Sequence, residues 1–120
     1  MSAPESPRHG LVFDLAVIEG EMRREDAYAK GGHTARTLVR TPDQRIVLIV
    51  MKEGARLAEH QASESASLHV VVGHVRLHLP DRVVDLGKNQ VLVLAGGIRH
   101  DVEATSDSSF LLTLSWHGEQ

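Results

Sequence analysis

The sequence predicts an all-β protein, an antiparallel barrel of short strands preceded by one short helix. Two observations support this fold class. From residue 35 onward, short apolar or alternating segments are separated by turn residues about every 8–12 positions, a spacing typical of sandwiches and barrels. Two of the apolar segments also lie beside a glycine-containing turn and a single histidine each. A chain of 120 residues can bury one core, so we expect a single domain.

The composition excludes several kinds of chemistry and partner. With 13 Lys and Arg against 16 Asp and Glu, the formal net charge is −3, and both signs are scattered along the chain, which favours neither nucleic acid nor an anionic membrane. The absence of cysteine excludes disulfides and thiolate chemistry. No apolar run approaches the roughly 20 residues of a membrane span, and the N-terminus lacks an apolar signal segment. We therefore expect a cytoplasmic protein.

The chain divides into a tail, a short N-terminal segment and the barrel. Residues 1–10 carry two prolines, two serines and alternating charges, a composition that cannot offset its ordering entropy by burial, and we expect them to be disordered. Residues 11–34 are expected to form an N-terminal strand and helix segment. Residues 35–117 are expected to form the barrel.

The N-terminal segment contains the expected helix. Asp14 is a good N-cap, and the apolar residues after it recur at helical spacing. Gly31 and Gly32 supply a stop, because glycine readily adopts the left-handed conformation that ends helices. The pattern therefore predicts one amphipathic helix over residues 15–30, packed outside the barrel.

The strand that begins the barrel core is apolar on both faces. Residues 46–51 form a continuous apolar run, and such a strand must be covered on both sides. The barrel interior covers one side, and either the helix or a second subunit covers the other. We therefore expect a homodimer. The other predicted strands are residues 35–40, 67–72, 74–79, 82–86, 91–94, 101–103 and 110–116, with residues 54–66 as a loop that carries His60.

Alternation separates inward from outward positions in the central strands. Leu68, Val70, Val75 and Leu77 belong to the apolar sets of their strands and are expected to line the interior. The neighbouring histidines at positions 69, 74 and 78 have the opposite parity and are expected on the outer surface. Of the eight histidines, His60 and His100 alone are placed, by loop and turn, where they could converge.

The segment around His60 resembles the first motif of the cupin superfamily, which reads Gly, five residues, His-x-His, three or four residues, Glu, six residues, Gly. Gly54, His60 and Gly73 match this motif at the right spacing. Ala62 occupies the position of the second histidine and Ala66 that of the glutamate. The resemblance therefore implies that the motif keeps its spacing while two of its three metal ligands are missing.

The segment around His100 resembles the second cupin motif, which reads Gly, five residues, Pro-x-Gly, two residues, His, three residues, Asn. Gly97 and His100 match it, whereas Ala95 replaces the proline and Ala104 the final asparagine. Asn89 replaces the first glycine. Asparagine tolerates the left-handed backbone conformation, so we expect the turn at this position to be kept.

The resemblance covers the chain from about residue 36 to residue 116, and more narrowly the chain is similar to the small single-domain bacterial cupins of the RmlC-like type. It implies a double-stranded β-helix, or jelly-roll barrel, and barrels of this family commonly form dimers. In members with complete motifs, three imidazoles and a carboxylate hold iron, manganese, nickel or zinc. The family includes dioxygenases, isomerases, epimerases, sugar-sensing regulatory domains and storage proteins, so the fold alone selects no function.

The residues present leave three functional hypotheses. The leading one is a protein that binds a small, largely apolar ligand in the barrel, between Leu68, Val70, Val75 and Leu77, with His60 and His100 as polar anchors. The second is a metal-dependent dioxygenase or isomerase that uses both histidines and Glu64. Two imidazoles bind a divalent ion weakly, so we expect either no cofactor or a weakly held Zn, Ni, Fe or Mn ion. The third is a structural or regulatory dimer without ligand chemistry, and the residues do not decide whether the protein is an enzyme.

Overall fold

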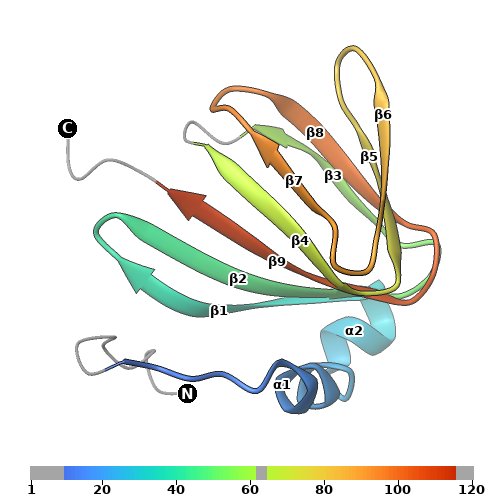
Figure 1. Ribbon diagram of the computed structural model, residues 1–120. Coiled ribbons are helices and arrows are strands. Elements are labelled where there is room, and N and C mark those ends of the chain that lie inside the picture. The colour runs from blue at the N-terminus through green and yellow to red at the C-terminus, as the bar shows by residue number, and fades with distance from the viewer. Residues whose placement is uncertain (1–9, 62–64, 116–120) are drawn as a thin grey trace.

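The computed structural model describes residues 10–61 and 65–115, with the backbone alone for residues 59–61. These residues form two short helices and nine strands (Figure 1). The elements are α1 (Leu15–Met22), α2 (Asp26–Gly31), β1 (His33–Thr41), β2 (Gln44–Met51), β3 (Arg56–Gln61), β4 (Ala66–Val72), β5 (His74–His78), β6 (Val83–Gly87), β7 (Val91–Leu94), β8 (Arg99–Ala104) and β9 (Ser108–Ser115).

The strands form two antiparallel sheets that face each other, which confirms the predicted all-β class. One sheet has the order β1-β2-β9-β4-β7 and the other the order β3-β8-β5-β6. In Figure 1 the two sheets lie close together on the right, where β4 turns into β5 and β8 into β9, and they diverge toward the left. No strand pairing joins the two sheets in the described ranges, so the barrel is open rather than closed.

Strand β3 is a difference from the sequence prediction, which made residues 54–66 a loop. The segment has little apolar alternation, and its extended conformation is held by main-chain pairing with β8. The barrel strands also begin earlier than residue 35, because β1 starts at His33. Of the predicted tail, Gly10 alone lies within the described residues, and residues 11–14 have no regular secondary structure.

The predicted helix over residues 15–30 is divided into two. Helix α1 begins as expected at Asp14, whose carboxylate accepts a hydrogen bond from the Val17 N–H at 3.2 Å. It ends at Met22, and Glu25 then adopts an extended backbone conformation ahead of α2. Helix α2 ends at Gly32, which has a positive φ of 84° as the predicted stop requires. None of the described helices is long and apolar enough to cross a membrane.

Two apolar cores lie on opposite sides of the five-stranded sheet, and β2 contributes to both. The inner core fills the space between the sheets and includes Val47 and Met51. The outer core lies between the sheet and the two helices and includes Leu48 and Val50. The helices therefore provide the cover that the two-faced apolar strand requires. The homodimer stays a prediction.

The motif turns adopt the backbone conformations that the sequence requires. Gly54, Gly73 and Gly97 all have positive φ angles, between 82° and 87°. Asn89, which replaces a motif glycine, has φ 68°, so the expected left-handed turn at this residue is confirmed. Each of these motif turns therefore keeps its left-handed conformation, because the residue at the turn position accepts a positive φ angle.

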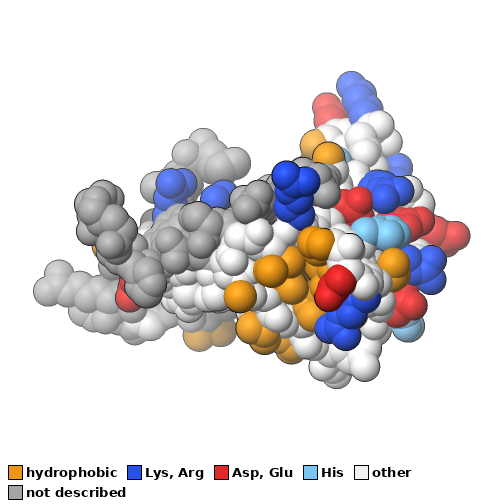
Figure 2. Space-filling model, turned by 90° about the horizontal axis from the view of Figure 1, so that it is seen from above, with side chains coloured by type: hydrophobic (Ala, Val, Ile, Leu, Met, Phe, Trp, Pro, Cys, Tyr) orange, Lys and Arg blue, Asp and Glu red, His pale blue; other side chains and the backbone are white. Residues whose placement is uncertain are grey.

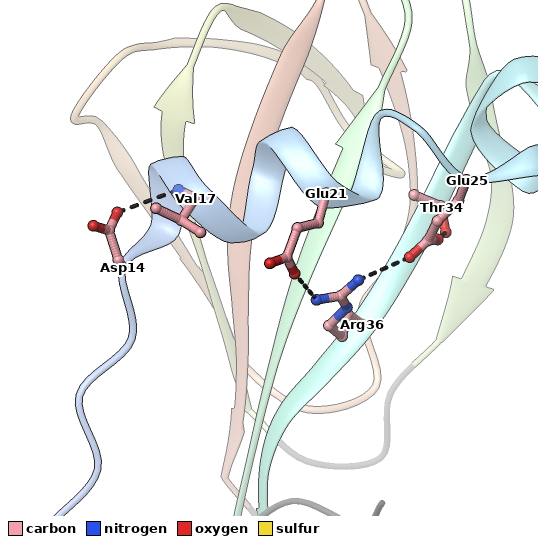
Figure 3. A network of polar contacts seen from close by, with 6 residues as sticks. All are labelled: Asp14, Val17, Glu21, Glu25, Thr34 and Arg36. Carbon is pink, nitrogen blue, oxygen red and sulfur yellow. Dashed lines mark hydrogen bonds and ion pairs between the residues drawn. The ribbon is translucent and has the colours of Figure 1, made fainter. Parts of the chain in front are cut away.

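The helices are fastened to β1 by a polar network on the outer face (Figure 3). Arg36 donates to the carboxylates of Glu21 and Glu25, each over 2.9 Å, and the Thr34 hydroxyl donates to Glu25 over 2.6 Å. The hydrogen bonds from Thr34 and then Arg36 lower the pKa of Glu25, because both favour its ionised form. The extended conformation that divides the helix thus places Glu25 against β1.

Glu25→Gln is expected to lower the free energy of unfolding by about 1 kcal/mol at pH 7, because the pair is partly exposed to solvent. The pKa of Glu25 is lower in the folded chain than in the unfolded one, so its contribution is present above the unfolded value, about 4.3, and is lost as the pH falls through the folded value. Urea unfolding at pH 7 and pH 3 measures this change. Glu53→Gln, at an exposed turn position, is the control. An equal deficit of the Glu25 variant at both pH values would contradict the assignment.

Candidate functional site

The inward face of the five-stranded sheet becomes more accessible along its strands. Register pairs its inward residues in rows that cross the sheet. The deepest of three such rows contains Ile49, Phe110 and Val70, which are all buried. The middle row contains Val47, Leu112, Leu68 and Leu92. The last row, which we call the mouth row, is Arg45, Leu114, Ala66 and Leu94.

Half-buried side chains mark where the interior meets solvent. In the middle row Leu112 and Leu92 are half-buried, and in the mouth row Leu114 and Leu94 are half-buried as well. These side chains face the interior by register yet remain partly accessible. The inner core is therefore open at the end where β2 and β4 begin and where β7 and β9 end.

His100 is buried within the four-stranded sheet. It lies on β8, its side chain is 4% exposed, and it shares the inward face with Val102 and Ala104. Its Nδ1 atom lies 3.1 Å from the carbonyl oxygen of Ile98. Because a carbonyl can only accept, Nδ1 carries a proton and donates this hydrogen bond. The main chain thereby helps to hold the orientation of the His100 ring.

The structure brings His60 next to His100 through main-chain pairing. The two residues are directly opposite each other in the β3–β8 register. Residues opposite one another in an antiparallel pair belong to the same face of a sheet, so both positions are on the inward face. The side chain of His60 is outside the described part of the structure, so its convergence with His100 stays a prediction.

The remaining metal positions of the first motif do not supply ligands within the described residues. Ala66 lies in the mouth row with a buried methyl group. Ala62 and Glu64 lie outside the described residues. No group of three His, Asp or Glu side chains that could hold a metal ion occurs in the part of the chain that the structure describes. These residues do not fit the four-ligand centre of the complete motif, and a reduced site that includes Glu64 stays a prediction.

The comparisons with known proteins agree with this architecture. No protein-family model and no curated protein matches the sequence. Among solved structures, a conserved Streptococcus pyogenes protein of unknown function has a TM-score of 0.76 at 22% identity, covering 99% of this chain and 98% of its own. An RmlC-like cupin from Methanocaldococcus jannaschii with a double-stranded β-helix fold has a TM-score of 0.67 at 17% identity, covering 72% and 83%.

A third structure, a cupin-2 domain protein from Shewanella frigidimarina, has a TM-score of 0.70 at 12% identity and covers 88% of this chain and 95% of its own. The chain has the cupin fold. This confirms the predicted double-stranded β-helix. At these identities the likeness establishes the architecture of the cupin barrel and leaves its ligand to be argued from the residues.

The predicted lining residues occupy different depths of the cupin barrel. Leu68 is in the middle row, next to the mouth row. Val70, Val75 and Leu77 lie in the inner core with at most 1% of their surface exposed. The accessible part of the interior is instead formed by leucines that the sequence prediction did not include. They are Leu92, Leu94, Leu112 and Leu114.

A charged cluster on the outer face supports the strand that carries His100. Asp101 accepts from Arg56 on β3 over 2.9 Å, and its other oxygen lies 2.7 Å from Nδ1 of His78 on β5. Partial burial raises the pKa of Asp101, but the hydrogen bonds from Arg56 and His78 outweigh this effect and hold the pKa below its usual value. The cluster therefore ties three strands together at the residue next to His100.

Charged and histidine side chains are also prominent in the space-filling view. Seen from above, Lys, Arg, acidic and His side chains gather at the right-hand end of the molecule, the end at which β5 and β6 lie (Figure 2). Arg76 and Asp85, paired over 2.8 Å between these two strands, belong to this outer face. The predicted outward parity of His74 and His78 agrees with this placement, since His74 is exposed and His78 is half-buried.

Arg45 is a candidate site residue that the sequence prediction missed. It has the inward parity of Val47 and Met51 on β2, and it is half-buried in the mouth row. The prediction began this strand at residue 46, which assigned Arg45 to the preceding turn. The available signal was the alternation itself, because continuing the parity of the apolar residues one step back reaches Arg45.

Proposed function

We propose that this cupin barrel binds a small molecule at the open end of its interior, with His100 as a polar anchor. The observation that supports the proposal most directly is the half-exposed leucine surface of the middle and mouth rows. Small-molecule sites are typically concave and apolar, with few polar groups that fix orientation. A buried imidazole on the facing sheet is a group of that kind.

The chemistry of His100 suggests which polar group a ligand would present. Its Nδ1 atom lies 3.1 Å from the Ile98 carbonyl oxygen, so His100 brings a hydrogen-bonding imidazole to an otherwise apolar interior. A ligand with a polar group would complement this ring. The proposed ligand therefore combines a hydrogen-bonding group with an apolar body that packs against Leu112 and Leu114.

His100→Leu is expected to weaken the binding of hexanamide about fivefold, because one hydrogen bond to a buried group contributes about 1 kcal/mol. Amide chemical shifts of ¹⁵N-labelled protein, followed during a hexanamide titration, give both the affinity and the location. His69→Leu makes the same exchange on the outward face of the five-stranded sheet and should leave the affinity unchanged. Chemical-shift changes confined to the outer face, or no changes at all, would contradict the proposal.

A metal-dependent dioxygenase or isomerase is a second candidate, and the β3–β8 register is the observation that favours it. Pairing His60 with His100 puts two imidazole-bearing positions side by side. The missing carboxylate at Ala66 weighs against a tightly held ion. We rank this candidate below ligand binding for that reason.

We also propose a second copy of the chain as partner, the basis of the structural or regulatory alternative. Two valines on the outward face of edge strand β7 are largely exposed, Val91 at 51% and Val93 at 70%. Apolar side chains next to an unpaired strand edge favour association.

The proposed location is the cytoplasm, since a chain without cysteine has no disulfide to lose under reducing conditions.

A further inference from the structure

Arg45 brings a positive charge to the open end of an apolar interior. Register places it in the mouth row directly opposite Leu114, which is itself opposite Ala66. Its Nε atom is buried and has no hydrogen-bond partner among the residues that the structure describes. A buried N–H group without a partner costs free energy, and the guanidinium geometry suits a carboxylate that can accept two hydrogen bonds at once. The orphaned atom therefore indicates a missing acceptor.

A second arginine stands beside the first. Arg40 on β1 is directly opposite Arg45 on β2, so the two positions share the inward face. Like charges directly opposite each other destabilise a strand pair, and solvent weakens the repulsion here because the Arg40 side chain is exposed. No ion pair among the described side chains includes either arginine, and the nearby Asp43 carboxylate accepts from the Thr41 hydroxyl over 2.9 Å. The arginine pair thus places two positively charged residues on one side of the sheet at the mouth, Arg45 half-buried and Arg40 exposed.

We propose that the ligand of the barrel is a small organic carboxylate, whose charged end binds Arg45 with Arg40 beside it. Its apolar body then lies along the mouth row, where Leu114 and Leu94 are half-buried. This inference rests on the proposed binding function and names the chemical class of the ligand. An anion can bind at this position although the net charge of the chain is negative, because both arginines lie at one end of one sheet.

Titration with hexanoate and with its neutral counterpart hexanamide tests the proposal. Both probes have the same apolar chain, so the difference in affinity reports on the carboxylate. Hexanoate is expected to bind about tenfold more tightly than hexanamide and to shift the Arg45 Nε–H resonance in ¹H–¹⁵N spectra. Arg45→Met should abolish this preference, and Arg40→Met should reduce it. Arg24→Met, which removes an exposed arginine between the helices, should leave the preference intact.

The outcomes separate this inference from the function on which it rests. Equal binding of both probes with shifts around His100 overturns the carboxylate assignment and leaves the binding function standing. An unshifted Arg45 resonance at saturating hexanoate also overturns the carboxylate assignment and leaves the binding function standing. The absence of chemical-shift changes in the interior with either probe overturns both the carboxylate assignment and the binding function. If Arg45→Met does not fold by circular dichroism, Arg45→Lys replaces it, and a preference that the lysine variant fully retains would contradict the proposed paired hydrogen bonds.

Discussion

The double variant Ala62→His, Ala66→Glu is expected to bind nickel or zinc about a hundredfold or more tightly than the unmodified chain. The two substitutions would restore the three-imidazole, one-carboxylate set that the resemblance to complete cupin motifs implies. Ala66 lies on the inward face in the mouth row, so a glutamate there starts from the correct side of the sheet. Ligands held on strands lose little further entropy on binding, which is why each one adds strongly to the affinity.

Isothermal titration with nickel measures this gain. The control is Ala62→His, Ser67→Glu, which places the new carboxylate on the outward side of the same strand. The gain of the first variant should shrink below about pH 6, because imidazoles with an ordinary pKa near 6.5 become protonated and stop coordinating. Equal affinity of the two variants would mean that the motif alignment around Ala66 is wrong.

Gly73→Ala is expected to lower the free energy of unfolding by about 3 kcal/mol or more. Gly73 joins β4 to β5 with φ 82°, a conformation that alanine adopts at a cost. A Cβ atom there would lie 2.2 Å from the Asp107 carbonyl oxygen and 2.5 Å from the Ser108 hydroxyl. Neither neighbour moves freely, because Ser108 donates to the His74 carbonyl over 2.8 Å and accepts from the His74 N–H over 3.0 Å.

Gly54→Ala separates the cost of the left-handed backbone conformation from the cost of the steric clash at Gly73. Gly54 has nearly the same backbone conformation, φ 87°, but no atom within 4 Å of its virtual Cβ. This variant should therefore lose about 1 kcal/mol from the conformation alone. Urea unfolding of both variants and of the unmodified chain gives the difference. Similar losses in the two variants would show that the turn at Gly73 has room to relax.

The parts of this fold that depend on local pattern could be predicted from the sequence. The inward parity of Leu68 and Val75 follows from alternation within single strands, and the turn at Asn89 follows from residue type. The division of the helix could not be predicted from local pattern, because Glu25, whose extended backbone separates the two helices, pairs with Arg36, eleven residues away on another element. Strand β3 likewise depends on its pairing with β8.

Of the candidate site, the inward position of His100 could be predicted from the second motif. The accessible leucines could not be recognised, because the exposure of a side chain depends on packing between the two sheets, which alternation within one strand does not show. The unpartnered Nε of Arg45 likewise follows from the placement of neighbouring strands rather than from the residue itself.

Because β2 separates the two cores, its alternate residues can change independently. Val47, Ile49 and Met51 belong to the inner core, whereas Leu48 and Val50 belong to the outer core beneath the helices. Substitutions at the three odd positions are therefore expected to change the packing between the two sheets while the attachment of α1 and α2 is unchanged. A library confined to these three codons would vary the inner core without changing the outer core, which makes this strand a natural starting point for redesigning the barrel.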